Sequence, residues 1–331
     1  MPITEIERND VAGNTAILRA WGGNCSVFHF HGIAKWTNQL AGDLHKDGNR
    51  YVFTSQGHLH YHSAFHALKK WAYLNLFSRF IREASGLHFL TQRERRRARL
   101  ILPAWKKPVL LQPNILTLPD EREITPAKRQ VVNIPEESFL FVYLGRIDVN
   151  HKGLDLLVQA FGKIANQTNS YLLLVGPDQS NGRQALQELA ARAGVHERVR
   201  FLESQLGAAK WSILKMADAF VSPSRWEAFS SAQVEAIGTG LPTIVSDQVN
   251  AASEMKASGA AMTSPLTVRD LSEAMLRLIN EPDLRQSLAT SGREWVAQTC
   301  SPEYAAERFA KFYRAVLDRP NRIADSPSDN R

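Results

Sequence analysis

Two glutamates eight positions apart, Glu227 and Glu235, are the first candidates for chemistry in this chain. Glu235 has no basic residue within several positions, and Glu227 has only Arg225 nearby. Carboxylates with so little neighbouring positive charge can accept hydrogen bonds from hydroxyl groups, such as those of a sugar or a ribose. The alternative for Glu227 is a charge at a helix start, where the helix dipole favours a carboxylate. Ser230 and Ser231 stand where that helix should begin, so we expect their backbone N–H groups to point toward a bound phosphate.

A second polar stretch, GRIDVNHKG at residues 145–153, follows an apolar run. Gly145 lets the backbone approach a ligand closely, and Arg146 and Lys152 bracket a short loop that leads into a helix. A guanidinium and an ammonium in this position suit a diphosphate. The stretch is neither a Walker A loop nor a GxGxxG motif, which argues against a dinucleotide-binding oxidoreductase. The alternative for Lys152 is a helix cap and solubilising charge.

The second part of the chain must supply the elements that position these residues. Apolar runs predict strands at 139–145, 171–176, 199–203, 219–224 and 242–247. Helical patterns are expected at 153–165, 182–194, 267–280, 282–298 and 302–317. Uninterrupted apolar strands that alternate with helices indicate a parallel sheet covered on both faces. Ligands bind beyond the carboxyl ends of such strands, which is where Arg146 and Glu227 come.

The first part of the chain repeats this alternation on a smaller scale. Strands are expected at 27–32, 50–55, 86–90 and 108–114. Thr91 and Glu94 have the spacing of a capping box, in which a threonine at the helix start is followed three residues later by a glutamate. A helix should therefore begin at Thr91.

Composition and charge limit the class of protein. The 331 residues suffice for two domains, and 44% hydrophobic with 22% charged residues is typical of globular proteins. We see no signal-peptide pattern and no apolar run of membrane-spanning length. Two cysteines form no disulfide framework, so we expect a cytoplasmic location. Of the 40 Lys and Arg residues 16 lie in residues 1–118, against 7 of the 33 Asp and Glu residues, so this part carries +9 and the remainder −2.

The positive charge of the first part predicts an anionic partner, with a solvated basic face as the alternative. Segment 65–84 interleaves aromatic and basic residues at helical spacing, as helices at a membrane surface do, and 93–99 is rich in arginine. A core-packing helix with a basic outer face would produce the same pattern in 65–84. An anionic membrane surface is thus an expected partner, and nucleic acid is not, because no recognised nucleic-acid-binding module occurs. No metal site is expected, because a polar rim or a plain helix start fits better than a metal site at His58, His60, His62 and His66.

Several stretches in order carry a resemblance to a known family: GRIDVNHKGLDLLVQAF, LLLVGP, VRFL, ADAFVSPSRWEAFSSAQVEAIGTGLPTIVSD and SGREWV. With them the chain resembles the GT-B glycosyltransferases of family 4, the group 1 retaining transferases, strongly over 137–317 and less strongly over 27–118. The resemblance implies two Rossmann-like parallel-sheet domains that face a cleft. Glu227 and Glu235 match the two glutamates of the family's E-x7-E motif.

The resemblance also implies roles for single residues. Arg146 and Lys152 match the basic pair that neutralises the donor diphosphate in place of a metal ion. Glu227 matches the glutamate that contacts the donor sugar, and Glu235 the one that binds the ribose. The loop and helix start that approach sugar and phosphate are matched by Phe229, Ser230 and Ser231. The implied reaction is metal-independent transfer of a hexosyl group, with retained configuration, from a nucleotide-diphosphate sugar, with no other cofactor.

The implied acceptor is a glycan or a lipid-linked molecule in cell-surface polysaccharide or lipopolysaccharide synthesis. The implied location is the cytoplasm, including the inner face of the cell membrane. The implied domains are an acceptor-side domain at 1–118, a linker at 119–136 and a donor-binding domain at 137–300. A C-terminal helix at 301–318 crosses back toward the first domain, and a tail at 319–331 is expected to be disordered.

The acceptor side departs from the family pattern. Gln56 stands where relatives have a histidine; it can bond a sugar hydroxyl but cannot act as an acid. His58 is a candidate substitute, and His31, in HFHG, is the third candidate residue on this side. Only 28 residues precede His29, so we expect a first domain shortened at its start. The alternative function is therefore a catalytically impaired nucleotide-sugar-binding protein that acts as a scaffold or regulatory partner.

Overall fold

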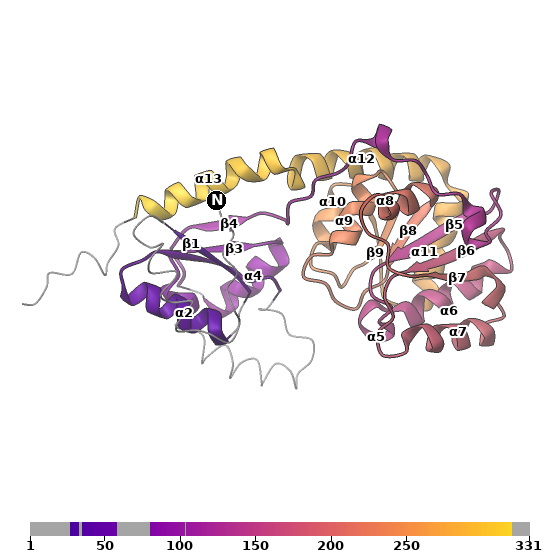
Figure 1. Cartoon of the computed structure of the whole chain (residues 1–331), viewed down its shortest axis with the longest axis horizontal. Coiled ribbons are helices and arrows are strands. Elements are labelled where there is room, and N and C mark those ends of the chain that lie inside the picture. The colour runs from indigo at the N-terminus through magenta and orange to yellow at the C-terminus, as the bar shows by residue number, and fades with distance from the viewer. Residues whose placement is uncertain (1–26, 33–34, 58–79, 103, 320–331) are drawn as a thin grey trace, which may run out of the picture. The chain divides into compact units, whose positions relative to one another are not determined.

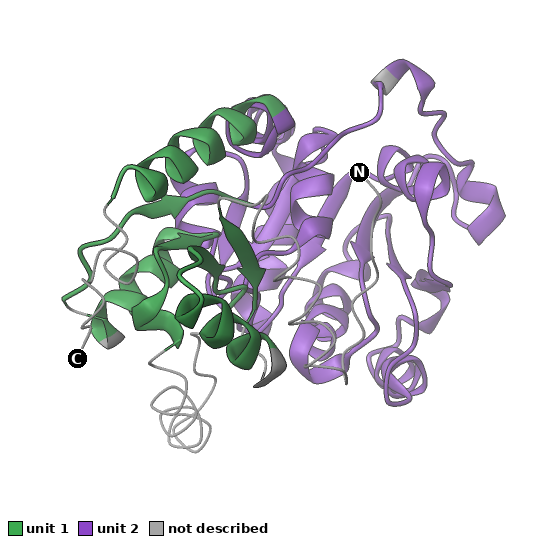
Figure 2. Cartoon of the chain, turned by 60° about the vertical axis from the view of Figure 1, so that its left-hand side comes forward, with its two compact units in different colours: residues 1–113, 303–331 green, residues 114–302 purple. Residues whose placement is uncertain are grey.

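The computed structural model describes residues 27–32, 35–57, 80–102 and 104–319 (Figure 1). The chain forms two compact units, drawn in different colours in Figure 2. The first consists of residues 1–113 and 303–331, and the second of residues 114–302. None of the helices within the described ranges is long and apolar enough to cross a membrane.

The first unit is built on a four-stranded parallel sheet with the order β1-β2-β3-β4. Its strands are β1 (Phe28–His31), β2 (Tyr51–Thr54), β3 (Gly86–Phe89) and β4 (Val109–Leu111), which confirms the four predicted strands. The helices α2 (Lys35–Lys46) and α4 (Gln92–Ile101) accompany it. Tyr51, Phe53 and Leu87 are almost fully buried in its core.

The last helix, α13 (Pro302–Leu317), packs on this first sheet, as the yellow ribbon beside β4 in Figure 1 shows. Its Phe312 and Val316 form a buried apolar cluster with side chains of β2 and β4. Gly86 of β3 makes room for this helix, because an added Cβ would lie 2.8 Å from the Phe312 ring. Helix α13 is therefore part of the core of the first unit.

The second unit has a six-stranded parallel sheet with the order β10-β9-β8-β5-β6-β7. Its strands are β5 (Phe139–Leu144), β6 (Ser170–Val175), β7 (Val199–Leu202), β8 (Ala219–Ser222), β9 (Thr243–Ser246) and β10 (Met262–Ser264). The first five confirm predictions, whereas β10 has the sequence Met-Thr-Ser, in which two of three residues are polar, and forms no apolar run.

Helices cover both faces of this sheet, which explains its almost uninterrupted apolar strands. Phe141 of β5 packs with α6 and α7 on one face, and Val142 packs with α8 on the other. The helices are α5 (Val149–Lys152), α6 (Leu154–Ala165), α7 (Gly182–Arg192), α8 (Gly207–Met216), α9 (Ser231–Gly238), α10 (Ala252–Ala257), α11 (Val268–Asn280) and α12 (Pro282–Cys300). Short 3-10 helices lie at η1 (Glu121–Glu123), η2 (Arg129–Val132) and η3 (His196–Arg198).

The order of the strands determines where the site can form. The chain runs outward from β5 through β6 to β7, and then returns to the other side of β5 with β8. Phe141 and Val142 of β5 pair directly with Ala219 and Phe220 of β8. The loops that follow β5 and β8 therefore emerge side by side, and such a reversal of strand order is where open α/β sheets bind their ligands.

The segment predicted as a linker, 119–136, falls within the second unit. The guanidinium of Arg129 pairs with Asp218 at 2.8 Å and donates to the carbonyl oxygen of Met216. Ile134 is buried in the same unit. The predicted tail begins at Arg319, which donates to the carbonyl oxygen of Lys106, and its remaining residues lie outside the described ranges.

Candidate functional site

The loop after β5 begins with Gly145, whose φ of 151° is one that residues other than glycine rarely adopt. An added Cβ there would lie 2.7 Å from the hydroxyl oxygen of Tyr143, which donates a hydrogen bond of 2.9 Å to the carbonyl oxygen of Arg146. Burial and then the Glu227 carboxylate raise the pKa of Tyr143 well above its usual value, so its hydroxyl stays a donor. Gly145 thus allows a buried tyrosine to shape the loop.

The short helix α5 sets the direction of Lys152. Asp148 is its N-cap residue and accepts a hydrogen bond from the backbone N–H of His151 at 2.9 Å. Gly153 ends it in the left-handed conformation, with a φ of 67°, and at once begins α6. An added Cβ on Gly153 would overlap the carbonyl oxygen of Pro223, so the loops after β5 and β8 touch at this point.

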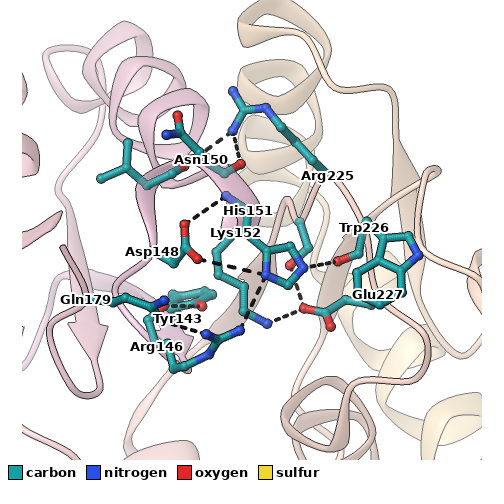
Figure 3. A network of polar contacts seen from close by, with 12 residues as sticks. Tyr143, Arg146, Asp148, Asn150, His151, Lys152, Gln179, Arg225, Trp226 and Glu227 are labelled. Atoms are coloured by element: carbon teal, nitrogen blue, oxygen red, sulfur yellow. Dashed lines mark hydrogen bonds and ion pairs between the residues drawn. The ribbon is translucent and has the colours of Figure 1, made fainter. Parts of the chain in front are cut away.

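Lys152 and Glu227 form a direct ion pair between these two loops (Figure 3). Their side chains are only 13% and 12% exposed. The hydroxyl of Ser224 donates a further hydrogen bond of 3.0 Å to the same carboxylate oxygen of Glu227. Glu227 lies in the loop after β8, and the positive neighbour that it lacks in the sequence is supplied by Lys152, 75 positions earlier.

Arg146 is held near this pair by the side chains of Gln179 and His151. Its guanidinium donates to the side-chain oxygen of Gln179 at 2.6 Å and lies 3.4 Å from Nδ1 of His151. The Nε2 of His151 lies 2.8 Å from the carbonyl oxygen of Trp226 and must donate to it, which leaves Nδ1 as an acceptor for Arg146. Figure 3 shows Arg146, Lys152 and Glu227 next to one another. Among the residues that the structure describes, the guanidinium charge is therefore oriented without a carboxylate partner.

A second ion pair lies on the helix that follows. Glu235 of α9 contacts Lys210 of α8 with a nitrogen–oxygen distance of 2.8 Å, and their side chains are 13% and 17% exposed. The ammonium of Lys210 also lies 4.3 Å from the centre of the Trp211 ring. Both glutamates of the motif thus hold a lysine brought by the tertiary structure.

The helix α9 begins at Ser231, where the sequence predicts a helix start. Ser230 is its N-cap residue, and its hydroxyl makes no capping hydrogen bond. Ser231 is the first helical residue, and Phe229 packs against the neighbouring apolar cluster. The first backbone N–H groups of α9 thus have no partner in the Ser230 side chain.

Arg225 joins the two loops firmly. Its guanidinium makes a bidentate pair with Asp155, at 2.9 and 2.7 Å, and its backbone N–H donates to the carbonyl oxygen of His151 at 2.9 Å. The basic residue closest to Glu227 in the sequence therefore has a structural partner. Sequence reasoning missed His151, Gln179 and Lys210; the position of His151 beside Lys152 was the one local signal.

In the first unit, Gln56 and His31 lie at the carboxyl ends of β2 and β1, with Nε2 of Gln56 3.5 Å from Nδ1 of His31. Gln56 has a left-handed backbone, with a φ of 46°. The buried carboxylate of Glu94 holds this turn by accepting from the backbone N–H of Gly57 at 2.6 Å and from the hydroxyl of Ser55. His58, the third predicted residue on this side, lies outside the described residues.

The same Glu94 confirms the start of α4 but corrects half of the capping box. The hydroxyl of Thr91 accepts a hydrogen bond from the backbone N–H of Glu94 at 3.2 Å, as predicted. The carboxylate bonds the backbone N–H of Leu90, at 2.9 Å, rather than that of Thr91. The carboxylate of Glu94 points toward the loop after β2, where the hydroxyl of Ser55 and the backbone N–H of Gly57 donate to it.

A chain of hydrogen bonds crosses the first sheet from His29 of β1 to Gln112, which follows β4. Nε2 of His29 lies 2.6 Å from the hydroxyl of Thr54, which lies 2.8 Å from Nδ1 of His88. Nε2 of His88 donates to the carbonyl oxygen of Gln112 at 2.7 Å, and Nδ1 of His29 lies 2.7 Å from the hydroxyl of Tyr313. With both rings neutral, every donor is assigned: Tyr313 to His29, His29 to Thr54, Thr54 to His88 and His88 to Gln112.

Burial opposes a positive charge in this chain of bonds. It lowers the pKa of His29 from 6.5 to about 3, with smaller contributions from His31 and His88. It also lowers the pKa of His88 to about 4. In the part of the chain that the structure describes, no group of three or more His, Cys, Asp or Glu side chains could hold a metal ion. The predicted histidine cluster at 58–66 lies outside those residues.

Residues 124–295 match the model of a protein family described as glycosyl transferases group 1. The chain is similar to the lipopolysaccharide core biosynthesis mannosyltransferase LpsB of Rhizobium meliloti, with 29% identity over 199 residues, 59% of this chain and 55% of the relative. It is also similar to the lipopolysaccharide glucosyltransferase WaaG of Escherichia coli K12, with 26% identity over 205 residues, 61% of this chain and 52% of the relative. The chain thus spans about half the length of these curated relatives.

Solved structures show the same fold over nearly the whole chain. A glycosyltransferase from Rickettsia africae superposes with a TM-score of 0.78 at 14% identity, covering 97% of this chain and 85% of that one. HepE of Anabaena, solved in complex with UDP and glucose, gives 0.71 at 16% identity, covering 95% and 84%. Together with the two parallel sheets, these similarities confirm the predicted GT-B fold.

Proposed function

The chain belongs to the group 1 glycosyl transferases, and from this premise we propose that it transfers a hexosyl group from a nucleotide-diphosphate sugar to a glycan or lipid-linked acceptor. The reaction retains the configuration of the sugar and needs no metal ion, as in the family 4 enzymes that the sequence resembles. It serves cell-surface polysaccharide or lipopolysaccharide synthesis, which the printed names of the mannosyltransferase and glucosyltransferase relatives support.

The observation that carries this proposal is the meeting of Arg146, Lys152 and Glu227 where the loops after β5 and β8 adjoin. When the bond between the sugar and the diphosphate breaks, negative charge grows on the leaving oxygen. A guanidinium and an ammonium already oriented in a partly buried site stabilise that charge without reorganising. They can take the part that a divalent cation plays in other phosphate-transferring sites.

The two glutamates divide the donor between them. Glu227 accepts hydrogen bonds from hydroxyls of the transferred sugar, close to the bond that breaks. Glu235, which keeps Lys210 beside it, accepts from the hydroxyls of the ribose. The backbone N–H groups at Ser231 and the following residues of α9 face a phosphate, where the helix dipole adds to the attraction.

On the acceptor side, Gln56 and His31 bind hydroxyls of the acceptor sugar. The carboxamide of Gln56 can donate and accept, and Glu94 fixes the turn that carries it. The basic face of α4, with Arg96, Arg99 and Leu100 exposed, provides contact with an anionic membrane surface on the cytoplasmic side. Cationic side chains beside an exposed leucine are suited to such a surface.

A donor panel tests the proposal first. Thermal unfolding is followed with UDP-, GDP- and ADP-sugars, and the sugars of one base should raise the melting temperature, because a ligand that binds the folded state stabilises it. Product formation is then measured with the stabilising donor. Stabilisation without any transfer to acceptors would support the alternative of a catalytically impaired nucleotide-sugar-binding protein.

Variants test the assigned roles. Glu227→Ala and Lys152→Ala should each lower transfer by at least about a hundredfold, because each removes a charged group at the reacting centre. Glu188→Ala and Lys163→Ala are matched controls of the same residue types on exposed helix positions of the second unit, and they should leave transfer unchanged. Turnover at the wild-type rate in either site variant would refute its role.

A further inference from the structure

The Lys152–Glu227 ion pair has a consequence that reaches beyond binding of the donor. Each member is largely enclosed, and each is the other's charged partner. Arg146, by contrast, pairs with no carboxylate among the described residues; its guanidinium contacts the side-chain oxygen of Gln179 and Nδ1 of His151. An incoming diphosphate therefore finds Arg146 ready, whereas it must compete with Glu227 for Lys152.

We propose that the Lys152–Glu227 pair makes the site discriminate between the nucleotide sugar and the free nucleoside diphosphate. This inference rests on the proposed function, in which the sugar lies at Glu227 and the diphosphate at Lys152. The ion pair opens when Lys152 turns to the diphosphate, and the sugar hydroxyls then take the place of the ammonium at Glu227.

The energetic argument concerns the carboxylate that is left behind. Without Lys152, Glu227 keeps the hydroxyl of Ser224 as a donor, in a position where its side chain is only 12% exposed. Breaking an enclosed ion pair by withdrawing one partner is costly, because the remaining charge is neither solvated nor paired. A nucleotide sugar offsets this cost with hydroxyl donors, and a nucleoside diphosphate has none to offer at that place.

The same difference acts on the product. Once the sugar has passed to the acceptor and left, Glu227 has lost the hydroxyl donors of the sugar and keeps that of Ser224. The carboxylate then attracts Lys152 back and weakens the hold of the site on the nucleoside diphosphate. The ion pair thus favours binding of the donor and release of the product with the same two side chains.

Calorimetric titration of the full chain tests this. The ligand pairs are UDP with UDP-glucose and GDP with GDP-mannose, and the quantity of interest is the ratio of the Kd of the diphosphate to that of its sugar. For the pair that binds wild type, this ratio should be about ten or more, the usual effect of hydrogen bonds to a charged group. In Glu227→Gln the diphosphate should bind more tightly than to wild type, and the ratio should fall to about one.

Glu235→Gln is the matched control, because it removes the same charge from the other ion-paired carboxylate. Ribose is common to both ligands of a pair, so this variant should change both Kd values by one factor and leave the ratio as in wild type. A diphosphate that binds Glu227→Gln no more tightly than wild type would overturn the inference, while the proposed function stood.

The wild-type ratio decides the question by itself if Glu227→Gln does not fold, which its melting curve would show. A ratio near one or below it overturns the inference. Failure of wild type to bind either ligand pair or any other nucleotide sugar would overturn the proposed function, and the inference with it.

Discussion

Acid should destabilise the first unit, because the hydrogen-bonded chain across its sheet requires two neutral histidines. His29 must accept from Tyr313, and His88 must accept from Thr54, each at Nδ1. A proton added to either nitrogen abolishes that acceptor in surroundings with little water. The folded-state pKa values, about 3 for His29 and about 4 for His88, follow mainly from this burial.

The sign and size of the effect follow from the two lowered pKa values. Above pH 6.5, the ordinary pKa of histidine, both rings are neutral in the folded and the unfolded chain. Their contribution to the free energy of unfolding therefore does not change with pH in that range. Below it the unfolded chain binds protons that the folded chain cannot, and stability falls until the folded pKa values are reached. Each unit by which the pH falls below 6.5 lowers the free energy of unfolding by about 1.4 kcal/mol per histidine. Lowering the pH to about 5 therefore costs about 2 kcal/mol for each ring, or roughly 4 kcal/mol for His29 and His88 together.

Hydrogen exchange can follow each unit separately. The opening free energy of peptides from β1 and β3, corrected for intrinsic rates, should fall by about 4 kcal/mol between pH 6.5 and about 5. His88→Gln keeps a donor for the carbonyl of Gln112 and cannot titrate, so it should lose about half of this pH dependence. His196→Gln, at an exposed position of η3 in the second unit, should lose none. The reasoning is refuted if His88→Gln and wild type lose stability equally as the pH falls.

Three further perturbations give sharp outcomes. Gly153→Ala should lower the free energy of unfolding of the second unit by more than about 3 kcal/mol, because a Cβ would overlap Pro223. The control Gly194→Ala has a similar φ of 69° but open space around it, and it should lower this free energy by only about 1 kcal/mol. Equal losses in the two variants would contradict the steric argument. Burial raises the pKa of the Cys300 thiol to about 11. Peptide-resolved mass spectrometry should therefore show that Cys300 is alkylated far more slowly at pH 8 in the folded chain than in urea, and equal rates would contradict the burial of this thiol. Arg96→Glu should weaken cosedimentation with vesicles that contain phosphatidylglycerol; equal binding to purely zwitterionic vesicles would disprove the electrostatic contact.

Local patterns were sufficient for most elements of the fold. Most of the predicted strands are apolar runs that lie buried in their sheet, and this burial leaves a signal in consecutive residues. The start of α4 at Thr91 was likewise readable, because a capping interaction spans one helical turn. The strand β10 was missed because its residues Met-Thr-Ser form no apolar run. The second role of Glu94 was missed because its partners Ser55 and Gly57 lie far away in the sequence.

The sequence by itself determined which side chains could do chemistry: two glutamates with few basic neighbours, and an arginine and a lysine just after a strand. Only the tertiary structure decided how they combine. Lys152 meets Glu227 across 75 positions because β8 returns to pair with β5, and Lys210 meets Glu235 because α8 and α9 cover the same face. Strand order depends on which crossovers bury the most apolar surface, and this property of the whole sheet leaves no trace in the spacing of neighbouring residues.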